Sequence, residues 1–282
     1  MLVKLTFPLP FMRLTKPTAV QPSLPAEKTS QLPEIGRLAI GITDRTNPAK
    51  PFPRATDYFV PRGEFAALFT EIHGEKPTWL DIFFHSDDHD FSCSERLEIR
   101  DASGKLFAYG DGETFYFYNE KERSYSARRL VSNIPTLLAD TLAHLQRGLA
   151  SDKAKHIKWR TMLYVRFLLK DFPALGYWQF TTQATTTSIP AIRDTFDNFL
   201  RTFGTVRYVP FRLSVKKVKS NQPGRSDQYA IVKLTPLISF EDGHRLAGSI
   251  AQNPDEHLPI SLISGMPKLL MGDGAAEADS MS

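Results

Sequence analysis

An amphipathic helix flanked by strand-like segments constrains the fold of this chain more than any other feature. Ser188 can cap the start of the helix, because a serine hydroxyl accepts hydrogen bonds from the free N–H groups of the first turn. Gly204 can end the helix, because glycine tolerates positive φ. The apolar positions recur at helical spacing: Ile189, Ile192, Phe196, Phe199, Leu200 and Phe203. Two strand-like segments precede the helix and two follow it: Trp159–Leu169, Gly176–Phe180, Val209–Lys219 and Gln228–Leu234. This order predicts a β-β-α-β-β unit in which the helix packs on a sheet of the four strands.

The rest of the chain carries shorter signals of both helix and strand. A helix with an apolar face ends at Gly74, Trp79–Phe84 is typical of a buried strand, and Asp101–Gly104 is typical of a hairpin turn. A second apolar stripe predicts a helix over Asn133–Leu149. Together these patterns predict an α+β fold with a mainly antiparallel sheet and a few packed helices.

Composition divides the chain into five expected parts. Closely spaced prolines predict an extended arm over residues 1–34, because proline fixes φ and lacks an N–H donor. We expect an acidic N-terminal α+β half over residues 35–132, a helical insert with a basic connector over 133–158, and a basic C-terminal α+β half over 159–240. Small and polar residues predict an irregular, loose tail over 241–282.

Charge is spread unevenly along the 282 residues, although the net charge is only +4. Residues 81–122 hold eleven acids and four bases, which is −7 by subtraction. Residues 150–233 hold fifteen bases and five acids, which is +10. The two regions can attract each other within the fold, or the basic region can attract a polyanion such as nucleic acid.

Cysteine content and hydropathy exclude several classes of protein. Cys93 is the single cysteine, so an intrachain disulfide and a cysteine-based zinc site are excluded. The absence of disulfides is typical of proteins in a reducing cytoplasm. No apolar run approaches the roughly 18 residues that a membrane span needs. Pro8 and Pro10 interrupt the apolar N-terminus, so we expect no signal peptide. We therefore expect a cytoplasmic protein.

The basic strand Val209–Lys219 is the candidate nucleic-acid site. Alternation places Arg212 and Lys216 opposite the apolar side chains of the strand, whereas Lys217 falls on the apolar side, which predicts a bulge or a strand end there. Hydroxyls before the helix N-terminus can add donors to a phosphate. The predicted nucleic-acid-binding residues are Arg207, Arg212, Lys216, Lys217, Lys219, Arg225, Thr187 and Ser188. The alternatives are a solvated strand face and plain capping chemistry.

An acidic loop after the strand Trp79–Phe84 is the candidate metal site. Its carboxylates and imidazoles suit a divalent cation: Asp81, His85, Asp87, Asp88 and His89. The spacing matches no standard zinc or calcium motif, so an acidic surface loop is the alternative. The sequence contains no evident Ser-His-Asp set, catalytic carboxylate pair or nucleotide-binding glycine motif. We therefore expect a protein without catalytic residues, and no cofactor other than this possible metal.

The order of motifs resembles the phage-type recombination directionality factors, which partner large serine integrases. The resemblance covers residues 35–236, through these segments: Leu38–Ile42, Asp57–Val60, Trp79–Asp88, Leu106–Glu113, Gly176–Thr182, Ser188–Ile189 and Val209–Leu213. It implies a non-enzymatic protein that binds an integrase on DNA and switches it from integration to excision. Members of this family often carry a cysteine cluster in the interval that is Thr114–Lys158 here, and this interval contains no cysteine.

Two other functions are compatible with the sequence. The β-β-α-β-β unit is also typical of the RNA-binding RAMP-like subunits of CRISPR-type ribonucleoproteins, although the strands carry no aromatic RNP signature. The acidic loop His85–Asp90 is compatible with a metal-dependent hydrolase. We expect DNA rather than RNA as the nucleic acid, and a serine integrase as the protein partner.

Overall fold

The computed structural model describes residues 32–44, 52–129, 133–219 and 228–252. From Pro33 onward the described residues form one compact unit. Most of the predicted proline-rich arm, residues 253–282 of the predicted tail, and Arg225 lie outside the described residues.

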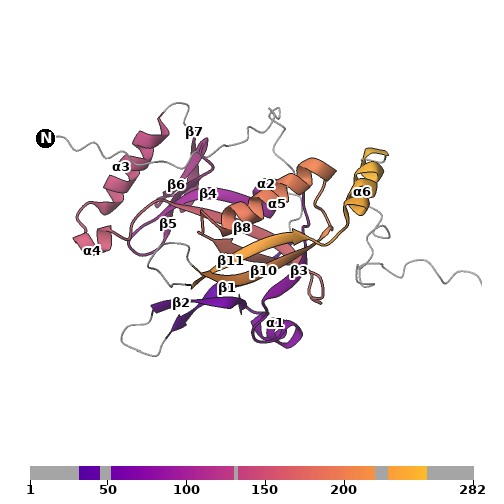
Figure 1. Cartoon of the computed structure of the whole chain (residues 1–282). Helices are drawn as coiled ribbons and strands as arrows, with labels where there is room; N and C mark the ends of the chain where they lie inside the picture. The colour runs from indigo at the N-terminus through magenta and orange to yellow at the C-terminus, as the bar shows by residue number, and fades with distance from the viewer. Residues whose placement is uncertain (1–31, 45–51, 130–132, 220–227, 253–282) are drawn as a thin grey trace, which may run out of the picture. The chain divides into compact units, whose positions relative to one another are not determined.

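Strands and helices alternate irregularly along the unit (Figure 1). The strands are β1 Glu34–Asp44, β2 Phe52–Arg62, β3 Trp79–Phe83, β4 Cys93–Arg100, β5 Leu106–Gly110, β6 Thr114–Asn119, β7 Ser124–Arg129, β8 Arg160–Leu169, β9 Tyr177–Thr182, β10 Pro210–Lys219 and β11 Gln228–Pro236. The helices are α1 Ala66–His73, α2 His89–Ser92, α3 Ile134–Gln146, α4 Ser151–Ala154, α5 Ser188–Phe203 and α6 Phe240–Gln252.

The described strands form one sheet, in the order β11-β10-β3-β8-β4-β5-β6-β7. Strand β8 also pairs with β9, and β9 pairs with β1, which pairs with β2. The β1–β9 pair is parallel and the other strand pairs are antiparallel. The predicted α+β class with a mainly antiparallel sheet is therefore confirmed.

The expected β-β-α-β-β unit has the predicted order along the chain but not the predicted sheet. Strand β3, from the acidic half, lies between β8 and β10, where Ile82 pairs with Leu169 on one side and with Phe211 on the other. Strand β1 adds to β9 on the far side of β8. The two halves expected from composition thus interleave in one sheet.

Helices cover one face of the sheet, which we call the inner face. The apolar stripe of α5 packs there, with Phe196 against Phe84 and Phe199 against Phe211. Helix α3 covers a second apolar cluster around Ile99 and Ala108 (Figure 1). Helix α1 contributes a further inner-face contact, that of Phe69 with Trp178 of β9. The opposite face, which we call the outer face, carries the polar and tyrosine side chains of the same strands.

Local signals explain the ends of α5, with one correction. Gly204 ends the helix in the left-handed region at φ 81°, as predicted. Thr187, however, is the residue that precedes the helix, and its side chain makes no capping bond. Ser188 is the first helical residue, and it is fully buried.

Of two other local predictions, one holds in part and one is wrong. The register between β10 and β11 runs without a shift through Lys217, so this pair has no bulge there, but the alternative of a strand end agrees with β10 ending at Lys219. Helix α6 occupies residues 240–252, where an irregular tail was expected. Its Leu246 is buried, and Gly243 packs so closely on Phe203 that a Cβ atom there would meet the ring. Ser239 accepts the Asp242 N–H at the start of this helix, and packing against α5 stabilises it further.

Candidate functional site

The acidic loop after β3 is held by hydrogen bonds to the segment between α5 and β10. One carboxylate oxygen of Asp87 accepts bonds from the N–H groups of Val206 and Arg207, at 2.7 and 3.1 Å. The Thr205 hydroxyl donates to the same carboxylate at 2.7 and 2.9 Å. Asp87 therefore joins two segments that lie over a hundred residues apart in the chain.

The other predicted metal ligands have separate partners. Asp88 caps the short helix α2 by accepting the Asp90 N–H at 3.0 Å. Nδ1 of His85 lies 3.1 Å from the Tyr208 hydroxyl. Nε2 of His89 lies 3.2 Å from the Asp197 carboxylate, and this hydrogen bond raises the pKa of His89.

No three His, Cys, Asp or Glu side chains among the described residues come together as a group that could hold a metal ion. The predicted ligand Asp81 pairs instead with Arg212, through two bonds of 2.8 and 3.1 Å. The prediction of a metal site gains no support from this arrangement, because each of the five side chains bonds to a neighbour of its own.

The predicted cations of the basic strand separate onto different faces. Arg212 lies on the outer face, where it also covers the Trp79 ring at 4.2 Å. Lys216 shares this face and is exposed. Lys217 points the other way and pairs with Asp57 of β2 at 3.3 Å. Lys219 is exposed at the end of β10.

Three further predicted residues, Arg207, Thr187 and Ser188, lie outside β10. Arg207 lies just before the first residue of β10, whereas Lys219 is the last residue of this strand. The Arg207 guanidinium lies near the Tyr208 ring. The Ser188 hydroxyl is buried and accepts the Val232 N–H at 2.9 Å, so Ser188 cannot contact a phosphate in this conformation. Thr187 is half-buried beside it. The Ser188 hydroxyl at the start of α5 is therefore used as the acceptor for a backbone N–H of β11.

A cationic and aromatic surface nevertheless forms on the outer face of β3, β10 and β11. We call it the cationic surface, and its residues are Trp79, Arg212, Lys216, Tyr229 and Lys233. Cross-strand pairing places them together: Ser214 faces Lys233, Lys216 faces Ile231, and Val218 faces Tyr229. Trp79 is 51% exposed and Tyr229 is 40% exposed, both unusual for large rings.

Sequence reasoning missed Trp79 and Lys233 as members of this surface. Trp79 begins a strand whose next residues are buried, so the pattern favours a core position for it. Lys233 joins Lys216 and Arg212 only through the register of the β10–β11 pair. The strand patterns of Val209–Lys219 and Gln228–Leu234 predict two strands but do not determine which of their residues face each other.

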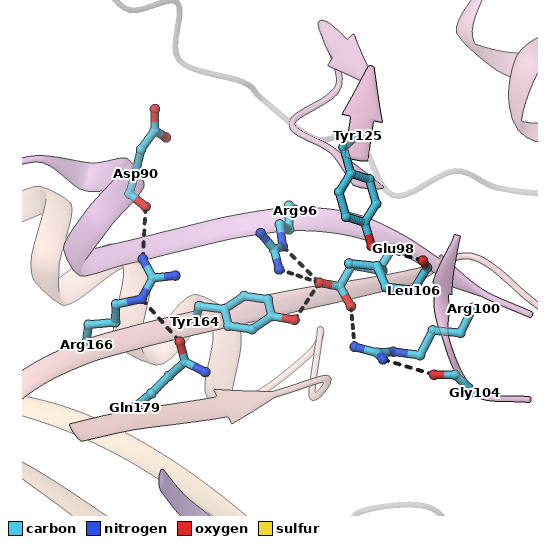
Figure 2. A network of polar contacts seen from close by, with 10 residues as sticks. All are labelled: Asp90, Arg96, Glu98, Arg100, Gly104, Leu106, Tyr125, Tyr164, Arg166 and Gln179. Carbon is cyan, nitrogen blue, oxygen red and sulfur yellow. Dashed lines mark hydrogen bonds and ion pairs between the residues drawn. The ribbon is translucent and has the colours of Figure 1, made fainter. Parts of the chain in front are cut away.

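A second polar surface lies on the outer face of β4, β5 and β8, and Figure 2 shows its centre. Glu98 is only 2% exposed and lies between two guanidinium groups, those of Arg96 at 2.8 Å and Arg100 at 3.3 Å. The Tyr164 hydroxyl donates a short hydrogen bond to the same carboxylate. Arg96 in turn lies over the rings of Tyr164 and Tyr109, at 4.2 and 4.7 Å.

The geometry defines an α+β protein with helices on one face of its sheet and exposed cations and aromatic rings on the other. The chain matches the family model described as Gp3-like, recombination directionality factor-like, over residues 35–237. The match covers more than half of the 282 residues, and the chain therefore belongs to the recombination directionality factor-like family. Searches of the curated proteins and of the solved structures found no match. Among the described residues, no helix is long and apolar enough to cross a membrane.

Proposed function

We propose that this chain is a non-enzymatic directionality factor, which binds a large serine integrase on DNA and biases it toward excision. The family match over residues 35–237 carries the proposal. In this role the protein changes which of two assembled states of the recombinase is favoured. It can do so only by binding the excision-competent state more tightly than the other state.

The cationic surface supports a position close to DNA. Lys216 and Lys233 are exposed on neighbouring strands, while the only acid beside them on β3, Asp81, already pairs with Arg212. Such a surface attracts the phosphate backbone without reading sequence, and its affinity falls with salt because bound counterions are released. The integrase then supplies the sequence specificity, and this chain adds affinity for DNA within the complex.

Recombination itself tests the main proposal. Purified chain is added to a large serine integrase from the same genome, with DNA carrying the two product sites of integration. We expect excision only when the chain is present, together with reduced integration on the original sites. Equal excision with and without the chain would contradict the proposal.

Salt dependence tests the DNA contact. In Lys216→Ala/Lys233→Ala, the slope of log affinity against log salt should fall by about 2 relative to the parent, which is about 1 for each lost phosphate contact. The matched control is Lys153→Ala/Lys155→Ala, which removes two exposed charges, one in α4 and one at its C-terminal end. An unchanged slope in the first variant would remove the cationic surface from the proposal. Stronger binding of RNA than of DNA would favour the RNA-binding alternative.

A further inference from the structure

Four tyrosines gather on the outer face of β5, β6 and β7, beside the Glu98 cluster. We call them the tyrosine surface, and its rings are Tyr109, Tyr116, Tyr118 and Tyr125. Strand register places them there, because Tyr109 pairs with both Glu98 and Tyr116, and Tyr118 pairs with Tyr125. The rings contact one another along the strands, and Tyr125 remains 38% exposed.

Groups of the same chain already cover part of the flat faces of Tyr109, Tyr116 and Tyr118, and Tyr125 meets its neighbours edge to face. Tyr109 and Tyr116 stack on each other, with centroids 5.0 Å apart and planes 14° apart. Arg96 lies over Tyr109 at 4.7 Å, and the Lys105 ammonium lies over Tyr118 at 3.7 Å. A nucleic-acid base binds an aromatic side chain through an open flat face. The Tyr125 hydroxyl donates to the Leu106 carbonyl at 3.0 Å, which fixes this ring (Figure 2). The tyrosine surface therefore offers mainly the edges of fixed rings, which suit a protein partner.

The charges beside the rings also favour a protein over a polyanion. The buried Glu98 carboxylate lies at the centre of the cluster, where its negative charge offsets one of the two positive charges of Arg96 and Arg100. The cations that remain accessible are Arg100, whose side chain is 47% exposed, and Lys105. Two separated cations beside rigid tyrosine rings are complementary, in charge and polarity, to a protein surface on which carboxylates flank apolar side chains.

We propose that the tyrosine surface, together with Arg100 and Lys105, docks a segment of the serine integrase that carries carboxylates beside apolar side chains. This inference rests on the proposed function and assigns its protein contact to one place on the sheet. Tyrosine and arginine are the residue types that most often dominate binding energy at protein interfaces. The mutual packing of the rings holds them in place before binding, so little side-chain entropy is lost.

Integrase affinity, measured with purified full-length chain and the integrase of the same genome, tests this assignment. We expect Tyr118→Ala/Tyr125→Ala to bind on the order of 30-fold more weakly than the parent. Lys105→Glu should bind several-fold more weakly at low salt and approach the parent at high salt, because salt screens exposed charges. Leu175→Ala, at an exposed apolar residue outside both surfaces, and Lys153→Glu on α4 are the controls, and both should bind like the parent.

The outcomes separate this inference from the function on which it rests. If the parent binds no integrase, the proposed function fails and the inference fails with it. If the parent binds and both test variants bind equally well, the inference alone is overturned. Loss of DNA affinity in the tyrosine variant, with integrase affinity kept, would assign the surface to nucleic acid and also overturn it. If the melting temperature shows that the tyrosine variant is unfolded, the comparison of integrase affinity between Lys105→Glu and its control Lys153→Glu decides whether the inference holds.

Discussion

At the scale of single residues, carboxylates that look like free metal ligands in the sequence are bound by the protein itself. Asp87 accepts the N–H groups of Val206 and Arg207 and the hydroxyl of Thr205. We expect Asp87→Ala to lower the free energy of unfolding by about 1–3 kcal/mol, because partly buried N–H groups lose their acceptor. Urea unfolding measures this change. Asp90→Ala, at an exposed position in α2, is the control and should change stability far less.

The same residue distinguishes a structural role from metal binding. If Asp87 acts only through these hydrogen bonds, a chelator should leave the melting temperature of the parent unchanged. A chelator that lowers the melting temperature of the parent but not that of Asp87→Ala would show that the loop binds a metal ion.

At the scale of elements, α5 and β11 are joined by a buried hydrogen bond. The Ser188 hydroxyl at the start of α5 accepts the Val232 N–H at 2.9 Å, and both residues are buried. We expect Ser188→Ala to reduce the free energy of unfolding by about 1–3 kcal/mol, since the buried N–H group loses its acceptor. Thr187→Ala should cost less than about 0.5 kcal/mol, because its side chain makes no capping bond. The opposite ranking in urea unfolding would mean that Thr187 caps the helix in solution.

At the scale of the whole molecule, the acidic and basic halves fold together because they share one sheet. Strand β3 lies between β8 and β10, and β1 lies beside β9. We expect residues 159–282 expressed alone to show no cooperative unfolding transition, since β3, which joins β10 to β8, and β1, which pairs with β9, would both be missing. The full chain should unfold in one transition when followed by circular dichroism. A fragment with its own cooperative midpoint would show that the basic half is an independent domain.

Much of the fold could be predicted because its elements have strong local patterns. The apolar stripe and terminal glycine of α5 are such signals, and β8, β9, β10 and β11 lie close to their expected positions. Strand β7 and helix α6 were not predicted. Helix α6 is amphipathic, and the packing of Gly243 on Phe203 of α5 and the burial of Leu246 stabilise it.

The candidate site was harder to predict than the fold, because it depends on which strands are neighbours. Lys216 was expected on a cationic face, and it is exposed there. Arg212 lies on the same face, but its charge is paired with Asp81 across a strand boundary that the sequence does not reveal. Lys217 likewise pairs with Asp57 of the N-terminal half, so part of the attraction between the acidic and basic halves is satisfied within the fold.

By itself, the sequence determined the fold class, the inner-facing apolar positions and the family, because periodicity and motif order are properties of the chain as written. Only the tertiary structure decided which charges remain available to a partner. A side chain at a given strand position always has the same chemistry, but its neighbours across the sheet determine whether that chemistry is already satisfied. The register between β10 and β11 brings Lys216 close to Lys233, whereas the register between β10 and β3 brings Arg212 against Asp81.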